Sequence, residues 1–332
     1  MNGTGRTARF STGWPQPRSP ATLRSMHSSS NKNRGLTAAT IFLLVLPPLL
    51  WAGNSVVGRA VYDMVPPMTL NFLRWVCAAL ILLPFGYQIF RPGSGLLTNW
   101  RRYALLGLLG VGSYNSLQYL ALHTSSAVNV TLVASSMPVW MMIIGRLFHG
   151  AAIRPVQVVG AALSLAGVVV ILGQGEWAQL MQFQFVPGDL LMIAATILWS
   201  FYSWQLLRGG DSPAVQSTWA TFLLVQVLYG AAWSGLFTAV EWSITDVQLE
   251  WNWTLTAALA YVAIGPAVIA YRCWGLGVQR VGPTTAGFFN NLTPLFAALL
   301  ALVMIGETPQ LYHAFAFALI LGGIVLSSGQ RT

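Results

Sequence analysis

Long apolar runs separated by short polar turns recur along the chain after residue 37, and this pattern limits its fold more than any other feature. A helix needs about 20 mainly apolar residues to cross the roughly 30 Å hydrocarbon layer of a bilayer. The runs are continuously apolar, whereas strands of a membrane barrel would alternate every second residue. The sequence therefore predicts an all-α integral membrane protein with ten transmembrane helices, approximately over residues 38–60, 68–90, 103–122, 126–145, 155–173, 188–207, 214–240, 254–274, 283–304 and 310–328.

The composition agrees with this fold class and excludes others. Only 8% of the residues are charged and 55% are apolar, whereas about 25% are charged in an ordinary soluble domain. A soluble enzyme or binding module is therefore excluded. The two cysteines, Cys77 and Cys273, lie in apolar surroundings, so neither a disulfide framework nor a cysteine metal site is expected.

Positive charge is distributed unevenly between the predicted loops. Because cytoplasmic loops retain Lys and Arg, both termini are predicted to be cytoplasmic, in a cytoplasmic (inner) membrane. Inside segments then hold Arg91, Arg101, Arg102, Arg146, Arg154, Arg208, Arg280 and Arg331, and outside loops hold Asp63, Glu176, Glu241, Asp246, Glu250 and Glu307. The net charge of +9 thus sets orientation and does not indicate nucleic acid as a partner.

Residues 1–36 differ from the rest because they are rich in Arg and Ser and contain no acidic residue. This composition is typical of a disordered basic cytoplasmic tail. An organellar transit peptide would have the same character, and so would a start codon placed too far upstream.

The chain also contains an internal repeat. A shift of 156 residues places Pro138 on Pro294 without a gap, and a shift of 148 places Trp51 on Trp199. Each copy would contain five helices, and this odd number turns the second copy upside down in the membrane. Inverted repeats recur in secondary transporters, with the substrate near the midplane between the copies. The predicted parts are a tail (1–36), a first repeat (37–173), an outer loop (174–187) and a second repeat (188–328).

Several stretches resemble the EamA-type branch of the drug/metabolite transporter superfamily. They are Pro294 through Gly306-Glu307-Thr308 to Gly322-Gly323, Trp51-Ala-Gly-Asn54, Asn71-Phe-Leu-Arg74, and Ser126-Ala127 leading to Pro138. The first copy departs from the family at Gly150-Ala151, where a glycine-glutamate pair is common. The resemblance covers about residues 38–328 and implies a ten-helix carrier of small metabolites that works by alternating access.

Three arginines fall within predicted helices, where a charge is costly and marks a candidate site. Arg74 lies about two turns into the second helix. It is predicted to bind an anionic group of the substrate, or alternatively to bond backbone carbonyls near a helix end. Arg59 and Asp63 have the spacing of a solvated pair at a helix end, and Arg272 is placed to extend its guanidinium to the lipid headgroups.

Uncharged polar and aromatic residues recur at helical spacing and give a candidate cavity lining. Amide side chains in particular need partners that lipid does not offer. Pro138 and Pro294 are predicted as mid-helix hinges beside the substrate path, with simple packing kinks as the alternative. The predicted substrate-binding residues are Arg74, Trp51, Asn54, Tyr114, Gln118, Trp199, Tyr202, Tyr261, Asn290 and Asn291.

The sequence predicts a secondary transporter and neither an enzyme nor a pump. No Walker-type loop, metal motif or catalytic set is present, so no cofactor or metal is expected. The expected partners are a small-molecule substrate and the lipid bilayer, and the chain is expected to be a monomer or a homodimer. Export of a polar or amphipathic metabolite, such as an amino acid, is the favoured function. The alternatives are a receptor or enzyme with a buried ligand site, or a passive pore.

Overall fold

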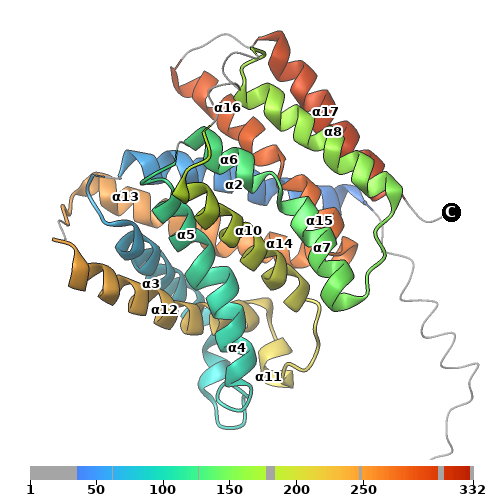
Figure 1. The fold of residues 1–332 in the computed structure, drawn as a ribbon. Coiled ribbons are helices and arrows are strands. Elements are labelled where there is room, and N and C mark those ends of the chain that lie inside the picture. The colour runs from blue at the N-terminus through green and yellow to red at the C-terminus, as the bar shows by residue number, and fades with distance from the viewer. Residues whose placement is uncertain are drawn as a thin grey trace, which may run out of the picture. The chain divides into compact units, whose positions relative to one another are not determined.

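The computed structural model describes residues 36–61, 63–125, 127–176, 184–246, 249–305 and 310–329. This part of the chain is helical and contains no strand (Figure 1). The predicted tail, apart from residue 36, lies outside the described residues, as do Glu307 and Arg331. The structure therefore supports the all-α fold class for the region that carries the repeats.

The first copy begins with two long helices, and its third and fourth helical runs are each divided. Proline is the first residue of both α3 and α8. It is tolerated there because the N–H groups of a first helical turn have no intrahelical acceptor. The elements are α2 (Ala38–Ala60), α3 (Pro67–Gly86), η1 (Tyr87–Phe90), α4 (Trp100–Leu106), the π-helical η2 (Gly107–Ser113), α5 (Tyr114–Ala121), α6 (Ala127–Ala134), α7 (Met137–His149) and α8 (Pro155–Leu172).

The second copy repeats this order, including the divided third and fourth runs. Its elements are α10 (Pro187–Gln205), α11 (Pro213–Gln216), α12 (Trp219–Ile244), α13 (Trp253–Val262), the π-helical η3 (Ala263–Ile269), α14 (Ala270–Val281), α15 (Pro283–Phe289), α16 (Leu292–Ile305) and α17 (Leu311–Ser328). The first helix of each copy packs mainly on the other copy: α2 lies against α14 and α16, and α10 lies against α5, α6 and α7.

Backbone irregularities recur at equivalent positions of the two copies. The π-helical segments at 107–113 and 263–269 are related by a shift of 156 residues, the shift that places Pro138 on Pro294. The fourth runs break at Ser135–Ser136 and at Asn290–Asn291, which agree within one residue under the same shift. A π-helical segment is rare and often accompanies a functional site, so two at matching positions argue for a shared architecture.

The last helices of the two copies, α8 and α17, pack antiparallel. A Cβ built on Gly160 would lie 2.8 Å from the Gly323 oxygen, and one built on Gly167 would lie 2.8 Å from the Ala316 oxygen. Under the shift of 156 residues Gly160 corresponds to Ala316 and Gly167 to Gly323, so the two contacts are equivalent. Equivalent helices that meet antiparallel in this way are related by a twofold axis across them, as an inverted repeat requires.

Within the described residues, seven helical segments are long and apolar enough to cross a membrane. The predicted runs at 103–122, 188–207 and 283–304 are helical but are not among the seven, because polar side chains or a break interrupt them. The count of ten spans therefore stays a prediction. The seven are Ala38–Gly58, Pro67–Phe90, Asn129–His149, Pro155–Leu172, Trp219–Ile244, Trp253–Val281 and Leu311–Ser328.

The two repeat prolines lie at helix starts and not in the middle of a continuous helix. Pro138 is the second residue of α7, and Pro294 is the third residue of α16. The prediction of a mid-helix proline is therefore wrong in its local detail, because in a first turn proline removes no intrahelical hydrogen bond. Each proline instead marks the restart of a helix after a break, and the hinge role stays a prediction.

Replacing Gly323 by alanine is expected to destabilise the α8–α17 pair. The new methyl would lie 2.6 Å from the Gly160 oxygen, and overpacking of this kind costs about 1–3 kcal/mol. The thermal unfolding midpoint in detergent should fall. Gly275→Ala is the control, because a Cβ there meets no atom within 4 Å and alanine favours the helix. Equal midpoints for the two variants would contradict the close packing.

Candidate functional site

A small cavity lies where the two copies meet. Its lining comes from α2, α5, α6, α7, α10, α14 and α16, and the described lining residues include no Asp, Glu, Lys, Arg or His. The free volume is about 50 Å³, enough for water but far below the roughly 300–1,000 Å³ of a small-molecule site. The lining residues are Trp51, Asn54, Ser55, Tyr114, Asn115, Gln118, Thr131, Ala134, Ser135, Met137, Trp199, Tyr271, Asn290, Thr293 and Pro294.

Aromatic rings crowd around Trp199 on one side of this cavity. The Trp199 ring centroid lies 5.3 Å from that of Trp51, 5.1 Å from Tyr114 and 5.3 Å from Tyr271. Trp51 and Trp199 are the pair matched by the shift of 148 residues. Equivalent residues touch one another only close to the axis that relates the copies, so the cavity lies near this axis.

The lining contains equivalent positions from both copies. Ala134 and Asn290 are related by the shift of 156 residues, and so are Met137 and Thr293. These positions lie at the breaks in the fourth runs. Discontinuous helices beside the site are a recurring device of secondary transporters, and here each copy contributes one.

Hydrogen bonds between the copies hold the π-helical segments beside the cavity. The Tyr271 hydroxyl donates to the Gly110 carbonyl oxygen, and the Trp51 indole N–H donates to the Pro266 carbonyl oxygen over 3.3 Å. Gly110 and Pro266 are equivalent under the shift of 156 residues. In each copy, therefore, the same irregular backbone position accepts a hydrogen bond from an aromatic residue of the other copy.

Arg74 is fully buried but does not line the cavity. Its Nη1 donates to Asn54 Oδ1 over 3.3 Å and to the Tyr119 hydroxyl over 3.4 Å. Asn54 does line the cavity, so the guanidinium lies one side-chain layer behind the wall. These partners are side chains, whereas the structural alternative for Arg74 expected backbone carbonyls.

Three other predicted site residues lie outside the lining. The Tyr202 hydroxyl donates to Gln226 Oε1, the Tyr261 hydroxyl donates to the Leu50 carbonyl oxygen, and Asn291 Nδ2 donates to Ser164 Oγ, over 2.9, 3.2 and 2.9 Å. Each of these groups thus has an internal partner. The lining residues Trp51, Asn54, Tyr114, Gln118, Trp199 and Asn290 were predicted, and Pro294 was predicted as a hinge.

The predicted site did not include Ser55, Asn115, Tyr271, Thr293 and four residues around the first break, Thr131, Ala134, Ser135 and Met137. The repeat itself carried a signal for one of them, because Ala134 is equivalent to the predicted residue Asn290. Tyr271 had no signal of this kind, since it reaches the cavity only because α14 packs beside α2.

The remaining arginine predictions fall at the periphery. Arg272 is half-buried, and its guanidinium lies 5.3 Å from the Trp219 ring centroid. The side chain of Arg59 lies outside the description, and Asp63 is exposed. His313 Nδ1 accepts from the Gln310 backbone N–H over 3.1 Å and so caps its own helix.

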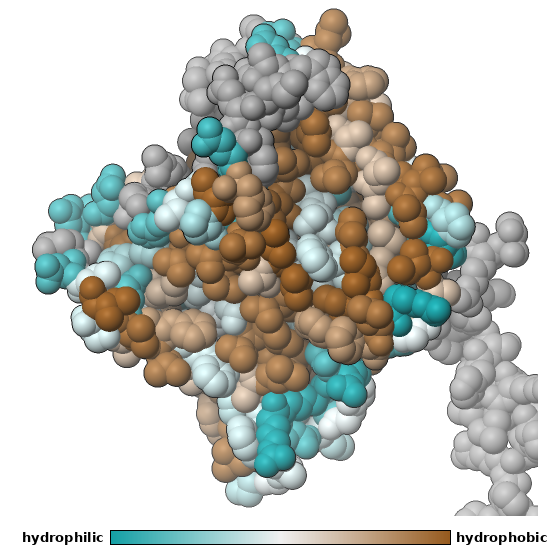
Figure 2. All heavy atoms as spheres, in the orientation of Figure 1, coloured by the Kyte–Doolittle hydropathy of each residue, from teal (hydrophilic) through white to brown (hydrophobic). Residues whose placement is uncertain are grey.

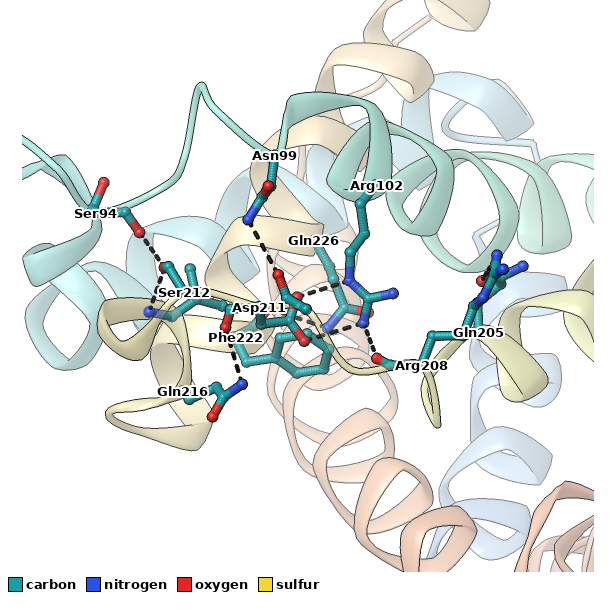
Figure 3. A network of polar contacts seen from close by, with 12 residues as sticks. Ser94, Asn99, Arg102, Gln205, Arg208, Asp211, Ser212, Gln216, Phe222 and Gln226 are labelled. Atoms are coloured by element: carbon teal, nitrogen blue, oxygen red, sulfur yellow. Dashed lines mark hydrogen bonds and ion pairs between the residues drawn. The ribbon is translucent and has the colours of Figure 1, made fainter. Parts of the chain in front are cut away.

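A polar cluster joins the two copies at the end where α4 begins and α10 finishes. Arg102 binds Asp211 through two hydrogen bonds of 2.8 and 3.1 Å, and its Nη2 also donates to the Arg208 carbonyl oxygen (Figure 3). Asn99 Nδ2 donates to the Gly210 carbonyl oxygen over 3.3 Å, and the Ser212 hydroxyl donates to the Ser94 carbonyl oxygen. We refer to these seven residues, Ser94, Asn99, Arg102, Arg208, Gly210, Asp211 and Ser212, as the Arg102 clamp.

The corresponding loops at the opposite end of the helices are joined differently. The Glu250 backbone N–H donates to the Met64 carbonyl oxygen over 2.9 Å. Glu241 on α12 accepts from the Met68 and Thr69 backbone N–H groups, at 3.0 Å each, and so satisfies the first turn of α3. A hollow of about 810 Å³, with Asp63, Glu241 and Asp246 in its lining, opens at this end.

The outer surface of the helices is apolar, as the bilayer requires. Figure 2 shows hydrophobic residues across the middle of one face and hydrophilic residues gathered near α11 and the start of α4. On the outside of α7, the large side chains of Leu147 and Phe148 are more than 60% exposed. This surface excludes a water-soluble state for the helical part.

Comparison with known proteins matches both halves of the chain to one family. The model described as the EamA-like transporter family matches residues 38–173 and 186–329. An uncharacterized transporter of Archaeoglobus fulgidus is 26% identical, over 89% of this chain and 99% of its own. The aromatic amino acid exporter YddG of Ancylobacter novellus is 28% identical, over 84% of this chain and 93% of its own.

Two further proteins extend the comparison. The S-adenosylmethionine/S-adenosylhomocysteine transporter of Chlamydia muridarum is 24% identical, over 85% of this chain and 89% of its own. A solved crystal structure with 24% identity has a TM-score of 0.67 and covers 88% of this chain and 96% of that one. This structural likeness supports the fold alone.

Proposed function

The chain belongs to the EamA-like transporter family, and from this premise we propose that it exports a small amphipathic metabolite, an amino acid or a related compound, by alternating access. It is a multi-pass membrane protein and a secondary metabolite transporter. The proposal adds ten membrane-crossing segments in two inverted copies, residence in the cytoplasmic membrane with both termini cytoplasmic, and the absence of a catalytic role.

One observation carries the proposal: the cavity lies between the copies and is lined by equivalent residues of both. Alternating access needs a site that both copies close around, because a rocking movement then opens it to one side at a time. A receptor or a passive pore has no need of this arrangement. The YddG exporter of Ancylobacter novellus, named for aromatic amino acids, favours the same substrate class.

The size of the cavity indicates that binding must be coupled to movement. About 50 Å³ holds no amino acid, so the copies have to separate around Trp51 and Trp199 before substrate enters. The rings would then offer an apolar face, and Asn54, Asn115, Gln118 and Asn290 would offer amide groups. The residues proposed to bind the substrate are therefore also the residues that have to move.

The test is counterflow in liposomes that contain the purified full chain. Candidate solutes come from a comparison of metabolites retained by cells with and without the protein. Saturable, protein-dependent exchange of at least one solute is expected. Flux without saturation would support a pore, and the absence of protein-dependent movement for every solute would overturn the transporter proposal.

Replacing Asn290 by leucine should weaken substrate binding while the protein stays folded. The amide lines the cavity, and loss of one neutral hydrogen bond costs about 0.5–1.5 kcal/mol, or roughly two- to tenfold in the half-saturating concentration. Thr254→Ala on α13, an exposed position, is the control. An unchanged half-saturating concentration in the Asn290 variant would remove this residue from the site.

A further inference from the structure

The least compensated polar group beside the cavity is the guanidinium of Arg74. The side chain is fully buried, and neither Nε nor Nη2 has a hydrogen-bond partner among the described residues. A guanidinium stays protonated in proteins and can only donate. The groups that it does contact, Asn54, Tyr119 and the Trp75 ring at 4.9 Å, are all neutral.

The cavity wall also contains a buried donor. Trp199 lines the cavity, and its indole N–H is buried without an acceptor among the described residues. The Asn54 carbonyl oxygen accepts from Arg74 and is therefore less available to a ligand. Among the described residues the lining holds no carboxylate, so nothing in the wall offsets the positive charge of Arg74. A buried donor without an acceptor is unfavourable, and a ligand that supplies acceptors relieves this.

Arg74 is separated from the cavity by one layer of side chains. Asn54 stands in this layer, with Arg74 on one side and the cavity on the other. Trp75, beneath the guanidinium, contacts the lining residue Tyr271 with ring centroids 5.0 Å apart. At this depth water screens the charge poorly, so the field of Arg74 reaches the cavity either directly or through the polarised Asn54 amide.

We propose that the cavity selects substrates that carry a carboxylate or a comparable anionic group, with Arg74 as its counter-charge and the apolar part of the substrate against Trp51 and Trp199. This rests on the proposed function and adds the charge class of the substrate. A cationic amphipath would approach a fixed positive charge with no carboxylate in the wall to offset it. A substrate with both charges, such as an amino acid, is accepted through its carboxylate.

Binding of matched acids and amines to the purified full chain tests this proposal without requiring movement across a membrane. The probes are 3-phenylpropionate against phenethylamine, and indole-3-propionate against tryptamine, with the thermal unfolding midpoint as the readout. In each pair the acid should stabilise the protein at a concentration at least tenfold below that of the amine. Equal effects in both pairs, or no stabilisation by either acid, would overturn the proposal.

Variants test whether Arg74 causes the preference for acids over amines. Arg74→Gln should abolish the tenfold preference for the acid, and Arg74→Lys should keep part of it. Arg272→Gln is the matched control, because this arginine also lies in an apolar helix but contacts Trp219 and not the cavity. An acid preference that survives Arg74→Gln would overturn the role of Arg74.

A second variant keeps the test decisive if Arg74→Gln does not fold. Trp199→Phe retains an aromatic ring but removes the indole N–H, and it should weaken binding of both acids severalfold while leaving the amines unchanged. Equal weakening of acids and amines would contradict the role of the Trp199 indole N–H as a donor to the acid. Failure of all solutes in liposome counterflow would overturn the proposed function, whereas loss of the acid preference in detergent would overturn only the charge class.

Discussion

Removing the Arg102–Asp211 ion pair is expected to open one end of the protein. In Arg102→Ala, a thiol introduced by Ser135→Cys in the cavity should react faster with a membrane-impermeant reagent added at the clamp end, in a background where Cys77 and Cys273 are replaced. The clamp ties residues 94–102 of the first copy to residues 208–212 of the second, and the two hydrogen bonds between Arg102 and Asp211 are charge-assisted. Such pairs are stronger than neutral ones.

The expected magnitude follows from partial burial. The Arg102 and Asp211 side chains are 18% and 10% exposed, so the pair is worth more than an open surface bridge. A coupling of about 1–3 kcal/mol between the two copies at this end would change the ratio of closed to open states there by roughly 5- to 150-fold. The labelling rate should rise within that range, and Asp211→Ala should have the same effect.

Arg208→Ala is the matched control for this prediction. Its guanidinium contacts Gln205, whereas its contribution to the clamp is the backbone oxygen, which the substitution keeps. The double variant Arg102→Ala with Asp211→Ala should add little to either single variant, because both remove one interaction. Additive effects, or an equal rise in Arg208→Ala, would show that the ion pair does not hold this end closed.

Trp199→Ala is expected to cause the largest loss of stability. Its ring contacts Trp51, Tyr114, Tyr202, Tyr271 and Trp274, with centroids 5.0–5.8 Å apart. Truncation of a buried tryptophan costs about 3–5 kcal/mol. The thermal unfolding midpoint in detergent should fall far more than in Gly323→Ala, and transport should be lost with it.

Trp242→Ala is the control, because it removes a tryptophan that lies outside the central aromatic cluster around Trp199. This residue on α12 is 54% exposed, although its indole N–H donates to Thr69 Oγ1. A small fall in the midpoint is expected there. If the two variants were equally destabilised, the packing around Trp199 would not be the centre of the structure.

The sequence was most informative where hydrophobic periodicity and the repeat decide the outcome. The all-α class follows from continuous apolar runs, and the pairing of Trp51 with Trp199 identified two residues that touch at the cavity. The breaks at Ser135–Ser136 and Asn290–Asn291 were not predicted, because serine and asparagine within an apolar run do not by themselves end a helix. The π-helical segments had no sequence signal either.

The direction of a side chain was the harder part of the site. Tyr202, Tyr261 and Asn291 have the residue types of a polar lining, yet each is bonded to a partner outside it. Helical spacing places residues on a face but does not say whether that face meets a cavity or a neighbouring helix. Arg74 shows the same limit, since its depth was predicted but the Asn54 layer in front of it was not.

The hydrogen bonds to Gly110 and Pro266 have a mechanical consequence. They join the copies near the axis that relates them, where a rotation displaces atoms least, whereas the loops of the Arg102 clamp lie at the ends of the helices and move furthest. A fulcrum of this kind favours tilting over sliding. The copies can then change which end is open without breaking the hydrogen bonds to Gly110 and Pro266. The contacts that have to break and re-form are those at the ends of the helices.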